Sequence, residues 1–318
     1  NAVLASLKRA MARCPDNIIL THEDLDQACK EQIHGQFQLV GFERRLVPKR
    51  SKSSIVLSPE NEDRLNDLIR MNKARKVLQG QWGFPETGTT VLLIGPSGTG
   101  KSACADCIAY ESGRPLKIVS CSEVMSSARV QTRSKLNQQI FSDVNSGAII
   151  VVEGAEVLFS QRTISPEILA YITLQLEMCT GTVILVATSP TGSDAWISCL
   201  DSAQNGLLKR MEFVLQFHKP DTLMRCQLWR KLIPERILIS PETKVRSITD
   251  EDFELLARKF DDFDGLLINK SIFRASAEAA LRTDPSKRFL LLSDLISAAE
   301  VERNRTFLQG SGLSSMYQ

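Results

Sequence analysis

The chain has 318 residues, of which 43% are hydrophobic and 24% are charged, and its formal net charge is +2. A soluble chain of this size can bury a sizeable core and suggests about two domains. The near-neutral charge gives no sign of a dedicated nucleic-acid or membrane-surface binder, and the longest apolar runs, residues 148–152 and 183–187, are far shorter than a membrane span.

The eight cysteines are scattered along the chain, which fits a reducing compartment. We therefore expect a soluble intracellular protein, most simply of the cytoplasm. Cys104 and Cys107 do form a C-x-x-C pair, but they lie within an expected helix and no second pair exists. We interpret them as small apolar residues that pack against a sheet. A redox or zinc role is the alternative.

The first residues of the chain resemble its last helices. Residues 1–32 and residues 270–303 each show the pattern of a helix, a short extended stretch and a second helix with an acid-rich start, where Asp24 matches Asp294. We interpret residues 1–34 as the helical tail of an earlier copy of the final domain. Chance similarity between two amphipathic helix pairs is the alternative. The chain begins with Asn rather than Met, which indicates a fragment.

The middle of the chain has the pattern of an α/β domain. A polar, basic stretch is followed by a helix with a good N-cap at Ser58. From Thr90, short apolar runs rich in β-branched residues alternate with amphipathic helices, which predicts a mostly parallel sheet of about five strands covered on both faces. After Lys219 the pattern is almost wholly helical. The expected parts are a helical tail (1–34), a basic linker (35–54), an αβα domain (55–218), a helical domain (219–305) and a flexible tail (306–318).

One motif in the α/β region carries clear chemistry. It follows an apolar strand, precedes a helix and fits the pattern G-x-x-x-x-G-K-[ST] of a phosphate-binding loop. In such a loop the backbone N–H groups and the N-terminus of the helix surround the phosphates of a nucleotide. Lys101 is expected to reach the β- and γ-phosphates, and the Ser102 hydroxyl to coordinate Mg²⁺. The expected phosphate-binding residues are Gly95, Pro96, Ser97, Gly98, Thr99, Gly100, Lys101 and Ser102.

The ordered set of motifs around this loop resembles the AAA+ ATPases, a family of P-loop NTPases. The resemblance implies an αβα P-loop sandwich followed by an all-helical AAA+ lid, with ATP and Mg²⁺ as cofactors. Together with the repeated helix pair, it implies the second module of a tandem AAA+ protein. The stretches that carry the resemblance are Trp82–Phe84, Ala155–Arg162, Leu207–Asp221 and Asp264–Ala280.

The resemblance also implies how subunits and nucleotide meet. ATP or ADP is expected between AAA+ subunits of a ring, usually a hexamer, with a protein substrate or adaptor as a further partner. Arg210 would be the arginine finger that reaches the γ-phosphate in the neighbouring subunit. The segment around Gly83 and the lid up to Lys270 would enclose the adenine. Either Lys270 or Arg274 would be the sensor 2 residue; helical phase does not choose between them.

The acidic motif of this family, four apolar residues followed by Asp-Glu, is altered here. Glu153 stands at the Asp position and keeps a carboxylate for Mg²⁺, but Gly154 replaces the Glu that polarises the attacking water. Loss of a positioned general base typically costs about 10²–10⁴ in rate. Glu156, three residues on, is a candidate substitute. Ser189 stands where the family's sensor 1 Asn orients the water, and either Thr188 or Ser189 could keep a weak version of that role. Ala128 stands where threading AAA+ rings carry an aromatic residue.

These losses favour a module that binds Mg-ATP but has lost most hydrolysis, and that supports the assembly or regulation of a protein-remodelling ATPase. The main alternative is a fully active AAA+ ATPase in which Glu153 or Glu156 does the catalytic work. A third alternative, a clamp-loader-like factor directed to nucleic acid, is disfavoured by the near-neutral charge.

Overall fold

The centre of the protein is a six-stranded sheet in a computed structural model that describes residues 43–121, 147–159, 166–189, 206–239 and 246–314. The strands are β1 (Glu43–Leu46), β2 (Thr89–Gly95), β3 (Leu116–Ser120), β4 (Ile149–Glu153), β5 (Thr182–Thr188) and β6 (Phe213–Gln216). Their order across the sheet is β1-β3-β4-β5-β2-β6. The last five in this order run parallel, whereas β1 pairs antiparallel with β3 at one edge. This confirms the predicted parallel sheet.

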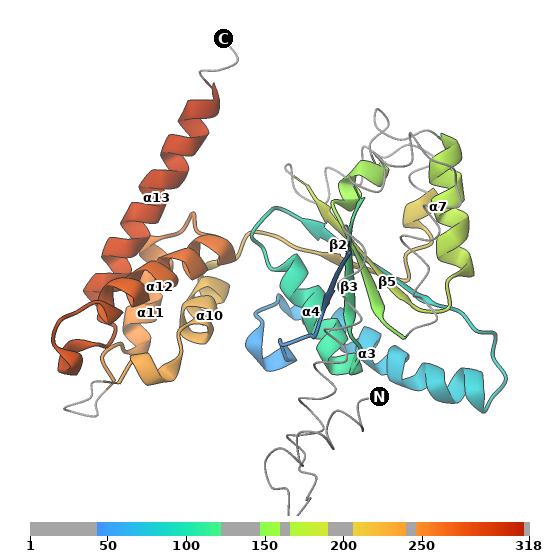
Figure 1. Ribbon diagram of the computed structural model, residues 1–318, viewed down its shortest axis with the longest axis horizontal. Coiled ribbons are helices and arrows are strands. Elements are labelled where there is room, and N and C mark those ends of the chain that lie inside the picture. The colour runs from blue at the N-terminus through green and yellow to red at the C-terminus, as the bar shows by residue number, and fades with distance from the viewer. Residues whose placement is uncertain (1–42, 122–146, 160–165, 190–205, 240–245, 315–318) are drawn as a thin grey trace, which may run out of the picture.

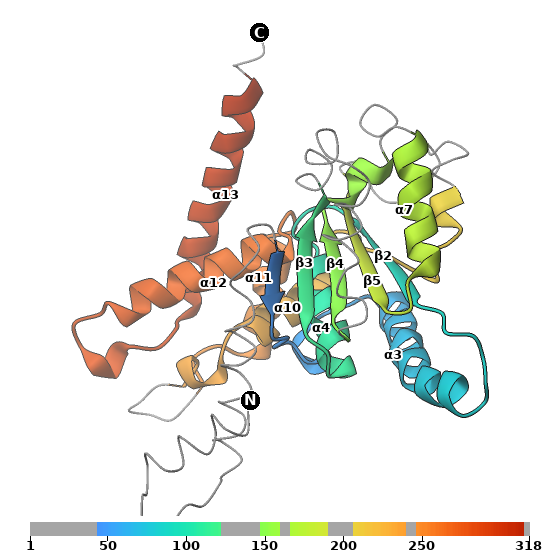
Figure 2. The same cartoon turned by 45° about the vertical axis from the view of Figure 1, so that its right-hand side comes forward.

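Helices cover both faces of the sheet, which explains why its central strands are continuous apolar runs. Figures 1 and 2 show α7 on one face of the sheet and α3 and α4 on the other, with a separate group of helices beside the sheet. The sheet-covering helices are α3 (Pro59–Gly80), α4 (Lys101–Ser112) and α7 (Pro166–Met178).

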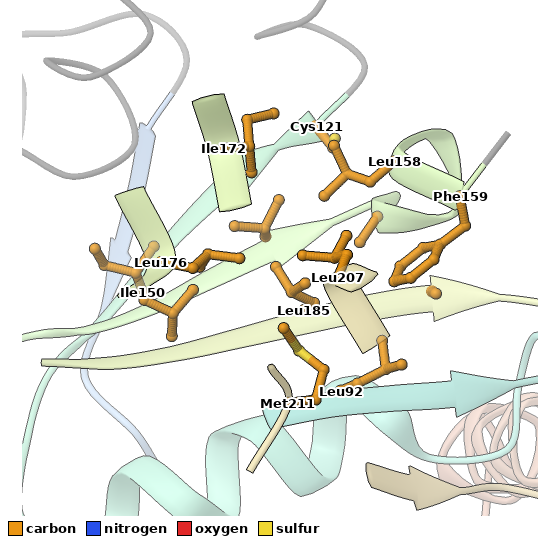
Figure 3. Close-up of a cluster of buried hydrophobic side chains, with 14 of the residues drawn as sticks. Leu92, Cys121, Ile150, Leu158, Phe159, Ile172, Leu176, Leu185, Leu207 and Met211 are labelled. Atoms are coloured by element: carbon orange, nitrogen blue, oxygen red, sulfur yellow. The ribbon is translucent and has the colours of Figure 1, made fainter. Parts of the chain in front are cut away.

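Alternate residues of each strand enter two separate cores. On one face, Leu92, Ile150 and Leu185 of the sheet lie with Ile172 and Leu176 of α7 (Figure 3). On the other face, the intervening strand residues pack against α3 and α4 in a second buried cluster. The period of two along each strand therefore builds the predicted αβα sandwich.

The C-terminal part is helical, as predicted, and has its own core. Its helices are α10 (Thr222–Leu232), α11 (Asp250–Lys259), α12 (Gly265–Ala280) and α13 (Leu292–Ser314). Trp229, Phe253 and Phe260 are fully buried among them. Arg282 ties the end of α12 to the start of α13 through two hydrogen bonds of 2.6 Å to the carboxylate of Asp294.

The predicted basic linker is not a solvated linker from Glu43 onward. Its residues supply β1, and the stretch that follows lies along α4, where the backbone N–H of Lys49 donates to Asp106 (3.2 Å) and that of Lys52 to Glu111 (3.0 Å). The predicted flexible tail also begins too early, because α13 continues to Ser314. The proposed helical tail of an earlier module, residues 1–34, lies outside the described residues.

Candidate nucleotide-binding site

The phosphate loop connects the carboxyl end of β2 to the N-terminus of α4, as the sequence predicts. Its three glycines have positive φ angles: 153° at Gly95, 78° at Gly98 and 99° at Gly100. A Cβ at Gly95 would lie 2.8 Å from the Cβ of Phe217, and one at Gly98 would lie 2.6 Å from the carboxyl carbon of Asp264. The glycines are therefore required by backbone conformation at all three positions and by close packing at the first two.

The Lys101 side chain folds back onto the loop. Its Nζ donates to the carbonyl oxygens of Gly95 (2.8 Å) and Pro96 (2.6 Å). Burial lowers the pKa of this ammonium group, and the negative charge of Glu156 partly opposes that shift. A phosphate group that took over from the two carbonyls would offer the amine a full negative charge in a partly desolvated place, which is a strong interaction.

Ser102 and Glu153 meet at the mouth of the loop. The Ser102 hydroxyl donates to Oε1 of Glu153 at 3.4 Å, although 51 residues separate them in sequence. Hydroxyl and carboxylate oxygens are ligands of Mg²⁺. In nucleotide sites Mg²⁺ typically binds one or two such protein ligands together with phosphate oxygens and waters. No cluster of three or more His, Cys, Asp or Glu residues suited to a metal occurs among the described residues. The pair therefore fits a cation that arrives with the nucleotide.

Of the residues that directly follow β4, Glu156 brings a carboxylate to the cavity and Gly154 brings no side chain. Gly154 lines the cavity with a φ angle of 73°, and no side chain is present there. Glu156, in a short 3-10 helix (Ala155–Phe159), accepts a hydrogen bond from the backbone N–H of Thr188 at 3.0 Å and also lines the cavity. Its charge acts on Lys101. Two carboxylates therefore line the cavity, at positions 153 and 156.

Of the two residues considered for the sensor 1 role, Thr188 faces the cavity and Ser189 does not. Ser189 is fully buried, and its backbone N–H donates to the carbonyl of Gly95 at 3.1 Å. Thr188 is exposed and lines the cavity instead. Neighbouring residues at the end of a strand point to opposite faces, so a shift of one residue changes which side chain can reach a ligand.

A cavity of about 530 Å³ lies between the phosphate loop and the helical domain. Its apolar wall comes from two places, the stretch Ile55–Leu57 before α3 and the helical domain with Leu228, Leu232 and Leu266. A cavity of this volume, apolar at one end and polar at the other, suits a small ligand with a planar ring at one end and charged groups at the other. The sequence signal for the first wall was the apolar run just before the Ser58 cap.

The predicted contribution of Gly83 to this wall is wrong for the arrangement seen here. Gly83 lies beyond the C-terminal end of α3, a helix of 22 residues that spans about 33 Å. Asn61, in the first turn of this helix, donates to the carbonyl of Gln216 (2.7 Å), whereas Arg75 near its end pairs with Glu212 (2.6 Å). The helix therefore runs antiparallel to the strands and carries Gly83 to the edge of the sheet opposite the phosphate loop.

The two sensor 2 candidates do not reach the cavity. Lys270 is exposed outside it, and Arg274 pairs with Glu302 of α13 at 2.7 Å. The residues of α12 that do line the cavity are Gly265, Leu266 and Asn269. The last residue of α12 that lines the cavity is therefore a neutral amide, Asn269, which is neither of the predicted cations.

Residues 91–218 match the model of one protein family, described as the ATPase family associated with various cellular activities (AAA). Over these residues the chain is similar to the AAA family. The match covers the phosphate loop and the segment from Glu153 to Glu156, which together line one end of the cavity, and it also includes β6.

A curated protein and two solved structures are also similar to this chain. The chain is 25% identical to the uncharacterized AAA domain-containing protein ycf46 of Trieres chinensis, over 98% of this chain and 62% of that protein. It therefore spans less than two thirds of that relative. Two crystal structures of the FIGL-1 AAA domain, one in complex with ADP, match with TM-scores of 0.57 and 0.58. They are 18% and 17% identical and cover 85% of this chain and 89% and 90% of theirs, which shows a shared fold.

Arg210 lies on the α/β domain just before β6 and does not line the cavity. Its guanidinium pairs with Glu177 of α7 and donates to the carbonyl of Gly206 at 2.8 Å. Both side chains of the ion pair are almost half exposed. Exposed pairs contribute little free energy, so Arg210 could exchange this partner for another at small cost.

No described helix is both long and apolar enough to cross a membrane.

The C-x-x-C pair is buried in the apolar core between the sheet and its covering helices. Burial raises the pKa of the Cys104 thiol above its usual range and that of Cys107 to about 12, and burial also raises the pKa of Cys121 to about 12. At pH 8 a thiol with a pKa near 12 is ionised in about one molecule in ten thousand, so it is a poor nucleophile and metal ligand.

We therefore expect iodoacetamide at pH 8 to leave these three thiols unmodified in the folded protein and to modify them in 8 M urea (a denaturing control), with the sites mapped by peptide mass spectrometry. Rapid native-state labelling of Cys107 would contradict the buried, unreactive assignment and favour the redox alternative.

Proposed function

We propose that the protein binds Mg-ATP in the cavity between the α/β domain and the helical domain, and that it hydrolyses this ATP slowly or not at all. The observation that carries the proposal is the pairing of a complete phosphate loop with Gly154, which offers no carboxylate where the family places its general base. The ADP complex of the FIGL-1 AAA domain supports a nucleotide as the ligand of this fold.

Each part of the cavity has a role in this proposal. The loop N–H groups, the start of α4 and Lys101 bind the phosphates. Ser102 and Glu153 hold Mg²⁺, which supplies charge neutralisation of the phosphates when bound. The adenine lies against Ile55–Leu57 and the apolar residues of α10 and α12. The helical domain acts as a lid over the nucleotide.

The consequence of holding ATP is assembly rather than turnover. A ligand present at a hundredfold excess over its Kd stabilises the state that binds it by about 2.7 kcal/mol. We propose that bound ATP stabilises a ring of subunits, in which Arg210 of each subunit contacts the nucleotide of its neighbour. The module would thereby support a protein-remodelling ATPase. The exposed position of Arg210, remote from its own cavity, is compatible with this role. Ala128, which would lie at the substrate-gripping position, is outside the described residues.

A second candidate is an active ATPase, and one observation favours it. Glu156 lies in the cavity, close enough to Lys101 to influence its charge, and is held by the N–H of Thr188. A carboxylate in this place could orient a water molecule once nucleotide displaces Lys101 from the loop carbonyls.

Glu156→Gln separates the two candidates, because glutamine is nearly isosteric but cannot accept a proton. If Glu156 is the general base, we expect single-turnover hydrolysis of Mg-ATP to fall by about 10²-fold or more with little change in the Kd. If the module only holds ATP, the wild-type rate is already slow and the variant matches it. Glu167→Gln, on the exposed start of α7, is the matched control.

A further inference from the structure

The helical domain touches the phosphate loop through the N-terminus of α12. Asp264 is the N-cap of this helix, and its Oδ1 accepts the backbone N–H of Leu267 at 2.8 Å. The same carboxylate lies on Gly98: a Cβ built there would be 2.6 Å from its Cγ and 2.9 Å from Oδ1. A Cβ at Gly265 would be 3.1 Å from the carbonyl oxygen of Gly98. The two segments can approach this closely because neither Gly98 nor Gly265 has a side chain.

This contact puts a negative charge against the loop that is built to receive phosphates. Within the described part of the chain, no Lys, Arg or His lies within ion-pair distance of Asp264. The nearby phosphate-binding cation, Lys101, is occupied by the carbonyls of Gly95 and Pro96. The charge on Asp264 is thus compensated only by the N–H groups of the helix that it caps.

We infer that Asp264 sets the affinity and the phosphate preference of the nucleotide site, because its carboxylate repels bound phosphates and couples their entry to the separation of the lid from Gly98. The inference rests on the proposed binding of ATP. It follows that the penalty grows with the charge of the ligand: largest for ATP, smaller for ADP and absent for adenosine. Two unit charges about 7 Å apart, in the dielectric range between a protein surface and water, change an affinity by on the order of three- to thirtyfold.

Asp264→Asn tests this with little disturbance of the fold, since asparagine caps helices as well as aspartate does. Affinities for adenosine, ADP and ATP are measured by titration calorimetry, with and without Mg²⁺. We expect the variant to bind ATP about three- to thirtyfold more tightly than wild type, ADP less so and adenosine equally. The increase in ATP affinity should be smaller in 0.5 M NaCl, because salt screens the repulsion between the carboxylate and the phosphates. Asp284→Asn is the matched control, because Asp284 also caps a short helix of the same domain and makes no contact with the loop.

The outcomes separate the inference from the proposed function. Unchanged or weaker ATP binding by Asp264→Asn, or an equal gain for adenosine, would overturn the inference while wild-type ATP binding still supports the proposed function. Absence of nucleotide binding by both proteins would overturn both. If the asparagine variant melts at a lower temperature than wild type, Asp264→Ser, another uncharged cap, replaces it and must show the same order of gains.

Discussion

Lys101→Ala is expected to weaken Mg-ATP binding at least about thirtyfold, because truncation of one partner of a buried charged pair costs about 2–5 kcal/mol. The amine of Lys101 is buried and already points into the loop, where it bonds to the Gly95 and Pro96 carbonyls. No other lysine or arginine of the loop itself can replace it. Titration calorimetry with Mg-ATP measures the loss.

The fold should tolerate this change better than the site does. Burial lowers the pKa of Lys101, so the folded state disfavours its charged form, and a neutral residue removes that cost. We therefore expect a small change in melting temperature without nucleotide, together with loss of the stabilisation that Mg-ATP gives to wild type. Lys287→Ala, on an exposed lysine of the helical domain, should leave both quantities unchanged. Equal Mg-ATP affinity of Lys101→Ala and wild type would rule out the phosphate loop as the binding site.

Gly154→Glu is expected to raise the single-turnover rate of ATP hydrolysis by about 10²-fold or more, because it restores a carboxylate where the family places its general base. The backbone conformation at this position lowers the stability of the variant. With φ at 73°, any side chain adopts a left-handed conformation that costs about 1–2 kcal/mol. Part of the variant's stability is lost for this reason, irrespective of the group introduced.

Gly154→Gln is therefore the decisive control, since it has the same size and the same backbone strain but cannot act as a base. Rapid-quench measurement of ADP formation on enzyme saturated with Mg-ATP compares the three proteins. The expected order is Gly154→Glu fastest, with Gly154→Gln no faster than wild type. Equal rates for the two variants, in folded proteins that bind ATP, would show that the missing carboxylate at position 154 does not limit hydrolysis.

The sequence predicted the αβα sandwich and the phosphate loop well because each depends on local patterns. Buried parallel strands are continuous apolar runs, and a loop of glycines between a strand and a helix has a single common geometry. The meeting of Ser102 with Glu153 follows from the same rule, since carboxyl ends of parallel strands share one edge.

The parts that the sequence did not predict depend on orientation between elements. The edge strand β1 is polar and basic, as edge strands commonly are, and so looked like a linker. The choice between Ile55–Leu57 and Gly83 for the adenine wall required the direction of α3, which tertiary bonds at Asn61 and Arg75 set. The contact of Asp264 with Gly98 joins residues far apart in the chain, and no periodicity indicates it.

If the protein holds ATP rather than consuming it, ATP that is already bound should leave the site unhydrolysed. The wild-type chain is loaded with Mg-ATP labelled on the adenine and the γ-phosphate, unbound nucleotide is removed, and an excess of unlabelled ATP is added. We expect the label to leave mainly as intact ATP, with dissociation faster than hydrolysis. Release mainly as ADP and phosphate, at a rate that Glu156→Gln abolishes, would contradict it and identify an active ATPase.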